Sequence, residues 1–304
     1  MITMDNDNFF KKHLAILYRK AKLKSNYFSM NLCSEKNGNN IISQKIKENR
    51  PFAVVRLGAV EMHCINRFLK HQNFSKSERE QALYCAGIFP NDNATLNKFC
   101  EEYLNAVTEC DIIGVWGISG EKHIVKHYTN HAQIIPSKSI EPYYFEHSWS
   151  ANLKDKKVLI IHPFTESIQH QLKHRQHLWQ NPNILPEFAK AEFVKVVQSN
   201  AGATTEFSDW FQALQSMKEQ ISQKDFDVAL IGAGAYGLPL SIFCKQMGKQ
   251  AVQLCGATQI LFGIKGKRWD NHPVISKFYN GYWIRPLSSE TPPEIQKVEG
   301  GSYW

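Results

Sequence analysis

The segment Gly232–Gly237 has the residue types and the spacing of a phosphate-binding turn. It reads G-A-G-A-Y-G, follows an apolar run at 227–231 and precedes a helix predicted at 238–247. Glycines let the backbone turn tightly and approach a phosphate, and the amides at a helix N-terminus point toward the anion. We therefore predict a nucleotide or another phosphate ligand here, with a structural glycine turn as the alternative. The residues predicted to contact the ligand are Gly232, Gly234, Tyr236 and Gly237.

Binding of a nicotinamide cofactor is a second interpretation of this turn. A dinucleotide-binding fold needs an acidic residue at the end of the next strand, where it binds the ribose hydroxyls. The corresponding stretch, 251–259, reads AVQLCGATQ and contains neither an acid nor an arginine for a 2′-phosphate. An NAD(P)-dependent oxidoreductase therefore remains an alternative to a protein that binds another nucleotide or phosphate ligand at this turn.

A second motif, R-L-G-A-V-E at 56–61, closes the strand predicted at 52–57. Ligands of open α/β sheets bind outside the carboxyl ends of the strands, so we expect Arg56 and Glu61 to face a cleft. Arginine offers a fork of donors to a phosphate, and we count Gly58 with it as a phosphate-binding residue. Glu61 would serve as a base, a metal ligand or an acceptor for sugar hydroxyls. A structural ion pair is the alternative.

The segment 161–166, IHPFTE, lies where the strand predicted at 157–161 runs into a helix predicted at 166–179. His162 and Glu166 would enter the same cleft as acid and base, or as groups that bind hydroxyls. In the alternative, Thr165 caps the helix and Glu166 interacts only with the helix dipole.

A basic loop follows the strand predicted at 251–254 and reads GATQILFGIKGKRWD at 256–270. Cations beside a phosphate-binding turn can neutralise a diphosphate leaving group, and an indole can stack on a base or a sugar. The candidates are Thr258, Gln259, Lys265, Lys267, Arg268 and Trp269. A solvated basic loop with a core tryptophan is the alternative.

Two sets of three histidines resemble metal ligands in their spacing. They are His123, His127 and His131, and His170, His174 and His177. Pro136 follows closely on the first set, and the second has no carboxylate at ligand spacing. Because zinc needs ligands that converge, the pattern disfavours metal binding at either set.

Alternating strands and helices must position these motifs. Apolar strands are predicted at 52–57, 111–116, 157–161, 193–197, 227–231 and 251–254. Helices are predicted at 60–70, 76–86, 94–109, 121–128, 166–179, 206–222 and 238–247. Continuous apolar strands separated by helices indicate a parallel sheet covered on both faces. We predict an α/β, Rossmann-like fold with a mostly parallel sheet and helices on both faces.

Four segments are predicted along the chain. They are 1–49, with a basic amphipathic helix (9–24) and a polar loop (34–40), a first α/β lobe (50–150), a second lobe (151–287) and an exposed C-terminal tail (288–304). Lysines and arginines surround the apolar stripe of the helix, so it would contact anionic lipid. Packing of that helix on its own domain is the alternative.

The composition is that of a globular protein. Of the 304 residues, 43% are hydrophobic and 21% charged, and the chain has neither a secretory signal nor a run of apolar residues that would span a membrane. Seven cysteines without C-x-x-C spacing argue against a disulfide framework, so we expect a cytoplasmic protein. The net charge of +8 favours an anionic partner. Without a zinc-finger, RNP-type or helix-turn-helix signature, we expect a phosphate-bearing small molecule and no nucleic acid.

The motif at 56–61 is similar to the R-F-G-D-G-E signature of bacterial glycosyltransferases with the GT-D fold. The stretches IHPF (161–164) and GATQILFGIKGKRW (256–269) also resemble those of uncharacterised proteins from capsule and O-antigen loci. The resemblance spans about 50–285 of the chain. The family's first acid falls at Ala59, so only Glu61 of its D-x-E pair is present.

The resemblance implies a Rossmann-like enzyme that moves a sugar from a nucleotide-sugar donor to a glycan or lipid-linked acceptor in polysaccharide synthesis. The glycine turn would hold the diphosphate, and Lys265, Lys267 and Arg268 would stabilise the departing nucleotide. Glu61 would be the family's remaining ligand for Mn²⁺ or Mg²⁺, unless the basic loop replaces the cation. The enzyme would be cytoplasmic, with peripheral contact at the inner membrane through residues 9–24. A nucleotide- or glycan-binding module without activity is a further alternative.

Overall fold

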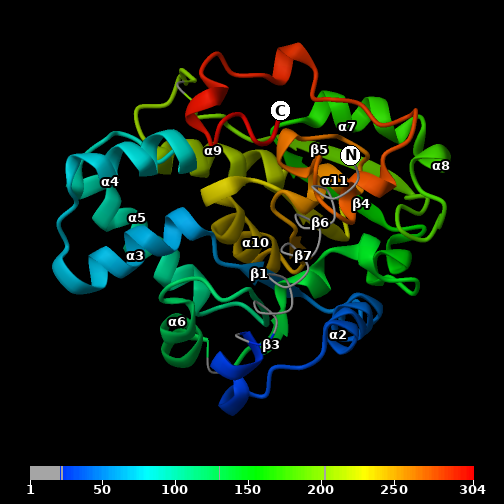
Figure 1. Ribbon diagram of the computed structural model, residues 1–304, viewed down its shortest axis with the longest axis horizontal. Coiled ribbons are helices and arrows are strands. Elements are labelled where there is room, and N and C mark those ends of the chain that lie inside the picture. Colours follow the sequence, from blue (N-terminus) through cyan, green and yellow to red (C-terminus); the bar gives the residue numbers. More distant parts are fainter. Residues whose placement is uncertain (1–20, 22, 130, 202) are drawn as a thin grey trace, which may run out of the picture.

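A sheet of seven parallel strands runs through the molecule in the computed structural model, which describes residues 21, 23–129, 131–201 and 203–304 (Figure 1). From one edge to the other the strands are β3 (Gln133–Pro136), β2 (Ile112–Val115), β1 (Phe52–Arg56), β7 (Gln250–Gln253), β6 (Val228–Ile231), β4 (Lys157–His162) and β5 (Lys190–Lys195). Because β1 pairs with β7, the lobes predicted at 50–150 and 151–287 share one sheet.

The strands form because their residues are apolar on both sides. In β1, Ala53 and Val55 pack into one hydrophobic core, whereas Phe52 and Val54 pack into the core on the opposite face. Side chains alternate between the two faces of a strand, so a central parallel strand covered by helices needs hydrophobic residues at every position.

Helices cover both faces of the sheet. Those packed into the core with Val55 are α3 (Ala59–His71), α5 (Asn93–Val107), α6 (Glu121–Tyr128), α9 (Trp210–Ser222) and α10 (Gly237–Gln246). Those packed into the core with Val54 are α2 (Glu35–Lys47), α7 (Thr165–Leu172), α8 (Arg175–Leu178) and α11 (Ala257–Leu261). The surface helix α4 (Lys76–Gln81) leads into a π-helical turn, η2 (Ala82–Ala86). The predicted α/β, Rossmann-like fold is confirmed.

Short 3₁₀ turns make up the remaining helical structure that the described ranges contain. They are η1 (Phe28–Met30), η3 (Ser137–Ile140), η4 (Pro142–Tyr144), η5 (Trp149–Leu153), η6 (Gly234–Tyr236), η7 (Lys267–Trp269), η8 (Ile275–Phe278), η9 (Ser288–Glu290) and η10 (Ile295–Lys297).

The strand order creates crevices where the loops of adjacent strands leave the sheet toward opposite faces. After β1 the chain enters α3 on one face, and after its neighbour β7 it enters α11 on the other. In the same way, α7 follows β4 on one face and α10 follows the adjacent β6 on the other. Open α/β sheets bind ligands in such crevices, outside the carboxyl ends of the strands.

The prediction of a polar loop at 34–40 is wrong, because these residues begin helix α2. The Ser34 side chain caps the helix by accepting a hydrogen bond from the Asn37 backbone N–H at 3.1 Å. Gly38 faces η3, where a Cβ would collide with the Ser139 side chain. The Asn- and Gly-rich composition indicated a loop, but tight packing against η3 accounts for the glycine.

The prediction of an exposed tail at 288–304 is also wrong, because this segment packs against the carboxyl edge of the sheet beside α7 (Figure 1). Glu290 is fully buried and accepts hydrogen bonds from the backbone of Glu166 at 2.7 Å and of Ser167 at 3.1 Å. The Ser167 hydroxyl donates to the same carboxylate, and the Trp304 indole donates to the Glu290 carbonyl at 3.1 Å. The C-terminal residues therefore complete the first turn of α7.

Replacing Glu290 should cost substantial stability. Glu290→Ala removes the acceptor for three donors, of which two belong to the buried Ser167, and an unsatisfied buried donor costs about 1–3 kcal/mol. We expect a loss of about 2–4 kcal/mol in the free energy of unfolding, measured by urea denaturation. Glu290→Gln keeps one acceptor oxygen and should lose less. An alanine variant as stable as the wild type would show that the C-terminal segment does not hold α7.

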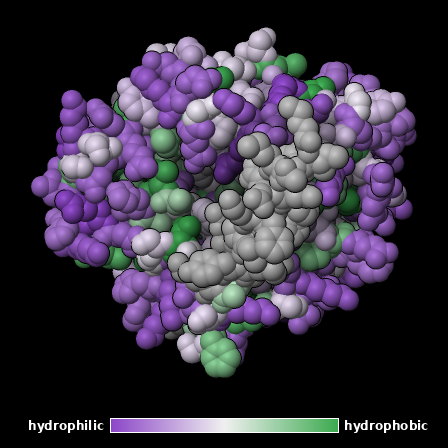
Figure 2. Space-filling model, viewed as in Figure 1, coloured by the Kyte–Doolittle hydropathy of each residue, from purple (hydrophilic) through white to green (hydrophobic). Residues whose placement is uncertain are grey.

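Most of the predicted basic helix at 9–24 lies outside the described residues, and of its end Ala21, Leu23 and Lys24 are helical. Within the described ranges, no helix combines the length and the apolar character needed to cross a bilayer. The face shown in Figure 2 is mostly hydrophilic and is hollowed near its middle, with hydrophobic residues at one side of the hollow.

Candidate functional site

Two adjoining cavities open at the carboxyl edge of the sheet. The glycine-turn cavity, of about 770 Å³, lies at the ends of β4, β5 and β6. The charged cavity, of about 1080 Å³, lies at the ends of β1 and β7. The residues that line both are Cys85, Gly234, Cys255, Gly256 and Tyr303. Cavities of this size suit small ligands, and their contact allows one extended ligand to occupy both.

The glycine turn forms the wall between β6 and α10. A Cβ on Gly232 would lie 2.5 Å from His162 Cδ2 and 2.9 Å from the Cys255 carbonyl oxygen, so this position has no room for a side chain. Gly234 has a φ of +52° and open space around it, and it lines both cavities. The turn thus presents bare backbone at the junction, as a close approach to an anion requires.

Gly237 and the Tyr236 ring pack against other side chains of the fold. Gly237 lines neither cavity and faces Gln253, whose Nε2 would be 2.9 Å from a Cβ. The ring of Tyr236 stacks on Trp210 at 4.8 Å, while its hydroxyl lies at the glycine-turn cavity, 3.0 Å from Ser199 Oγ. Of the residues predicted in this turn, the cavity therefore receives Gly232, Gly234 and Tyr236.

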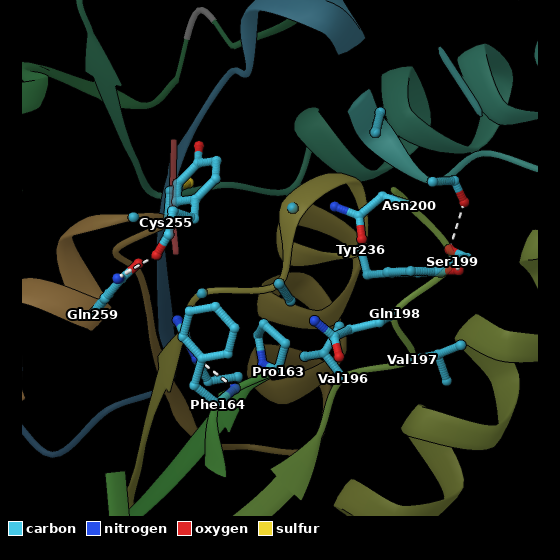
Figure 3. A pocket seen from close by; sticks show the side chains of 18 of the residues that line it. Pro163, Phe164, Val196, Val197, Gln198, Ser199, Asn200, Tyr236, Cys255 and Gln259 are labelled. Carbon is cyan, nitrogen blue, oxygen red and sulfur yellow. Dashed lines mark hydrogen bonds between the residues drawn. The ribbon is translucent and has the colours of Figure 1, made fainter. Parts of the chain in front are cut away.

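Amide side chains that the sequence did not single out line the glycine-turn cavity. Gln198 and Asn200 follow β5 and flank this cavity together with Phe164, which comes from the end of β4 (Figure 3). Among the described residues, neither amide side chain has a hydrogen-bond partner. An aromatic ring with free amide donors and acceptors is a suitable surround for a nucleobase.

His162 lies in the glycine-turn cavity as predicted, but its surroundings do not suit proton transfer. Burial lowers the pKa of His162 to about 3, so the ring is neutral at physiological pH. Its Nδ1 accepts a hydrogen bond from the Phe164 backbone N–H at 3.0 Å. The remaining ring nitrogen then carries the hydrogen, and it can donate to a ligand but cannot accept a proton.

The expectation that Glu166 enters the same cleft is wrong, because Glu166 lines neither cavity. Its carboxylate accepts from Lys195 Nζ and from the Ser289 hydroxyl, both at 2.8 Å, and these hydrogen bonds lower its pKa. The predicted alternative, a residue that serves its helix terminus, describes the position better: Glu166 is in the first turn of α7.

Arg56 extends from the end of β1 into the charged cavity. Its guanidinium carbon lies 5.2 Å from the centre of the Trp116 ring, and Nη1 lies 4.0 Å from Glu141 Oε1. The side chain is 18% exposed, yet its guanidinium makes no hydrogen bond within the described part of the chain. A buried guanidinium with free donors is well placed to bind the oxygen atoms of a ligand.

Glu61 sits in the first turn of α3 and is 8% exposed. A Cβ at residue 58 would collide with its carboxylate, so Gly58 is what leaves room for Glu61. Burial raises the pKa of Glu61, while its own backbone N–H and Arg56 act in the opposite direction. The alternative interpretation of this motif, a structural ion pair between Arg56 and Glu61, is not found among the described contacts, where Arg56 pairs with Glu141.

The raised pKa of Glu61 predicts a pH-dependent effect on stability. Because the pKa is higher in the folded state than its ordinary value of 4.5, the stability from this group is present at low pH and is lost as the pH rises through the folded pKa. Relative to Glu61→Gln, the wild type should therefore lose stability as the pH rises above the ordinary value of 4.5. Urea denaturation as a function of pH checks it, with exposed Glu80→Gln as the control. A difference that does not change with pH would contradict the assignment.

Glu141 is a residue of the charged cavity that the sequence analysis missed. It lies between η3 and η4, in the segment that follows the short strand β3, and its Oε2 accepts from the Tyr143 hydroxyl at 2.7 Å. Burial raises the pKa of Glu141, partly offset by Arg56. No local motif surrounds it, so the sequence offered no signal for its place in the cavity.

The basic loop contributes fewer residues to the site than predicted. Arg268 and Trp269 line the charged cavity, and Arg268 lies between the Trp269 and Tyr303 rings and 3.6 Å from Glu299. Lys265 and Lys267 line neither cavity, since Lys267 Nζ donates to the Gly300 carbonyl and Lys265 lies over Tyr279.

Two further predicted residues lie deeper. Gln259 reaches the glycine-turn cavity but donates to the carbonyls of Lys265 and Tyr303 at 3.0 and 2.7 Å. Thr258 is fully buried, and its hydroxyl has no hydrogen-bond partner in the described structure. Both help to shape the loop behind the cavities.

A divalent cation has a weak donor set here. Within the described ranges, no three His, Cys, Asp or Glu side chains converge, either at Glu61 or at the two histidine sets. The positive charge of Arg56 already interacts with both carboxylates, Glu61 and Glu141. The site therefore does not fit a metal held by protein ligands alone, and binding of Mn²⁺ or Mg²⁺ stays a prediction.

Comparison with known proteins identifies the family. A family model described as a GT-D fold-like domain matches residues 35–261. The chain belongs to this family. The match extends from the start of α2 to the end of α11, and so it includes the GT-D motif at 56–61 and the glycine turn. No curated protein and no solved structure matches the chain.

Proposed function

We propose that this GT-D-like protein is a glycosyltransferase that takes a sugar from a nucleotide-sugar donor. The observation that carries the proposal is the junction of the two cavities, where the bare backbone of Gly234 meets the cavity that contains Arg56 and Glu61. A nucleotide sugar has a base at one end, a sugar at the other and a diphosphate between them. The two cavities and their junction match these three parts in order.

The diphosphate would lie at the junction. The glycine turn before α10 offers the bare backbone of Gly234 there. From the charged cavity, Arg56 and Arg268 would donate to the phosphate oxygens, which stabilises the charge on the departing nucleoside diphosphate. The sequence predicted that Lys265, Lys267 and Arg268 would together stabilise this charge. Of the three, Arg268 lines the cavity, and it would take this role.

The base and the sugar would occupy the two ends. Gln198, Asn200 and Phe164 suit a nucleobase, and the neutral ring of His162 adds a hydrogen-bond donor beside it. The carboxylates of the charged cavity suit sugar hydroxyls, which donate hydrogen bonds.

Glu61 would act as the base of the transfer. An acceptor hydroxyl oxygen attacks the anomeric carbon, the bond from that carbon to the diphosphate breaks, and the hydroxyl proton passes to the Glu61 carboxylate. Burial moves the pKa of Glu61 toward neutrality, which is what a general base requires. We place the acceptor, a glycan or a lipid-linked glycan, in surface polysaccharide synthesis, with residues 9–24 as the membrane contact.

An NAD(P)-dependent oxidoreductase is the competing function, because the glycine turn alone fits it. After β7 the chain continues as Leu254, Cys255 and Gly256, so this strand end offers no acid for the ribose hydroxyls. The alternative therefore depends on one motif, whereas the transferase uses both cavities.

A thermal-shift panel tests the proposal. UDP, GDP, CDP and CMP are compared with NAD and NADPH, each with and without Mn²⁺. A ligand at about 100 times its Kd stabilises the fold by about 2.7 kcal/mol if it binds only the folded state. We expect a shift with one nucleoside phosphate and none with the dinucleotides. A shift with NAD or NADPH alone would overturn the proposal in favour of the oxidoreductase.

A further inference from the structure

The charged cavity holds hydrogen-bonding groups that the protein itself leaves unused. Arg56 makes no side-chain hydrogen bond in the described structure, and the 4.0 Å from its Nη1 to Glu141 Oε1 is too long for one. One oxygen of Glu141 is engaged by Tyr143, which leaves Oε1 free to accept. The two side chains are 18% and 20% exposed, so a ligand in the cavity can reach this donor and this acceptor, which lie side by side.

The position of Glu141 is held firmly. Tyr143 orients the carboxylate through its hydroxyl, and the Tyr143 ring stacks on Trp179 with centroids 5.7 Å apart and planes at 2°. Both rings are buried in the core beneath the cavity. A carboxylate fixed in this way is preorganised for a directional hydrogen bond and has little freedom to move aside.

Carboxyl groups outnumber guanidinium groups in the lining of the charged cavity. Its ionisable lining comprises three carboxylates, Glu61, Glu141 and Glu299, against two guanidinium groups, Arg56 and Arg268. Each arginine lies near one carboxylate, Arg56 near Glu141 and Arg268 near Glu299. Glu61 has no ion-pair partner within 4.0 Å among the described residues, so a carboxylate brought in by a ligand would find no further cation to pair with.

We propose that Glu141 binds a hydroxyl group of the donor sugar and that the charged cavity selects an uncharged sugar over a sugar acid. This proposal rests on the proposed transferase function and specifies its substrate class. A sugar hydroxyl both donates and accepts, so it can bridge Glu141 Oε1 and a donor of Arg56. A carboxylate in place of that hydroxyl would have no hydrogen to give to Glu141.

Isothermal titration calorimetry with two ligand series tests the assignment. One series is UDP, UDP-glucose and UDP-glucuronic acid, and the other is GDP, GDP-mannose and GDP-mannuronic acid. In the series whose diphosphate binds, the wild type should prefer the neutral sugar nucleotide over its acid by about tenfold or more. Glu141→Gln should weaken the neutral sugar nucleotide by about tenfold, since a hydrogen bond to a charged group is lost.

UDP and GDP lack the sugar, so their binding distinguishes a loss of sugar binding from damage to the rest of the site. In Glu141→Gln, affinity for UDP or GDP should stay within about threefold of the wild type, and the preference over the acid should shrink to less than about threefold. Tyr143→Phe keeps the ring stack and removes the orienting hydroxyl, so it should weaken the sugar nucleotide alone, by a smaller factor. Glu146→Gln, an exposed change in the same segment, is the control and should behave like the wild type.

Three outcomes would overturn the proposal in distinguishable ways. Equal losses of diphosphate and sugar nucleotide in Glu141→Gln would make Glu141 a support for Arg56 and not a sugar ligand. Equal affinity of the wild type for the neutral sugar and the acid would remove the selection. If the wild type binds none of the six probes, the inference falls, and the proposed function falls with it when CDP and CMP also fail to bind.

Discussion

Glu61→Gln should nearly abolish sugar transfer and leave the fold intact. The amide has the shape of the carboxylate but cannot take a proton, and loss of a general base typically costs 10²–10⁴ in rate. Because burial already disfavours the ionised carboxylate, the substitution removes an unfavourable charge and should not lower the free energy of unfolding near neutral pH. The expected result is an inactive enzyme with wild-type stability and nearly wild-type affinity for the nucleoside diphosphate.

The measurement is the rate of nucleoside diphosphate release from the donor, together with urea denaturation of the same preparations. Glu80→Gln provides a control of matched chemistry, because that glutamate lies on the surface helix α4 and, among the described residues, forms an ion pair with Lys76 alone. Retention of full activity in Glu61→Gln would remove Glu61 from the mechanism. A fall in activity together with a large loss of stability would make it a structural residue of the α3 N-terminus.

Arg56→Ala should have the second largest effect, on donor binding. Hydrogen bonds to charged groups contribute about 1.5–3 kcal/mol each, so loss of one or two from the diphosphate should weaken binding by about 10–100-fold or more. Arg56→Lys keeps the charge but not the planar fork, and we expect it to recover only part of the affinity. Unlike Glu141→Gln, both variants should weaken the nucleoside diphosphate as well as the sugar nucleotide.

Removal of Arg56 also takes the nearest cation away from the buried Glu141, so stability has to be followed in parallel. Arg50→Ala, at an exposed arginine before β1, serves as the control. If Arg56→Ala bound the nucleoside diphosphate as tightly as the wild type, Arg56 would belong to the structure of the charged cavity and not to donor binding.

The parts of the site that the sequence predicted are those carried by a strand end and a short motif. Arg56 ends β1, Glu61 lies in the first turn of the helix that follows, and Gly232 comes directly after β6. The rule that parallel sheets bind ligands at their carboxyl ends is enough to place these residues at the same edge. Their spacing within each motif is local, so neither the sheet order nor long-range packing is needed to see it.

Other residues depend on contacts between distant parts of the chain. Glu141 enters the charged cavity because the chain after β3 folds back toward the end of β1, and no local pattern encodes that path. Lys265 and Lys267 lie within three residues of Arg268 in the sequence. In the structure, the 3₁₀ turn η7 and the C-terminal segment place Arg268, but neither lysine, at the cavity. Local charge density therefore overestimated the number of cations at the site.

The predictions of a loop at the start of helix α2 and of an exposed C-terminal tail are wrong for a related reason. Polar composition indicates exposure on average, yet Gly38 is buried against η3 and Glu290 against the first turn of α7. In both places a small or polar residue is required by one specific partner, Ser139 or Ser167, more than a hundred residues away in the sequence. Composition cannot reveal a partner of this kind.

Turnover of a nucleotide sugar is the most direct test of the central claim. The purified protein is incubated with donors that carry a radiolabelled sugar, with Mn²⁺ or with EDTA, and with a lipid-linked glycan as acceptor. Released nucleoside diphosphate and transferred label are then measured. The account predicts release and transfer from one donor class by the wild type, and neither from Glu61→Gln. Intact donors in every reaction, together with tight binding of NADH, would contradict it and establish the glycine turn as a dinucleotide site.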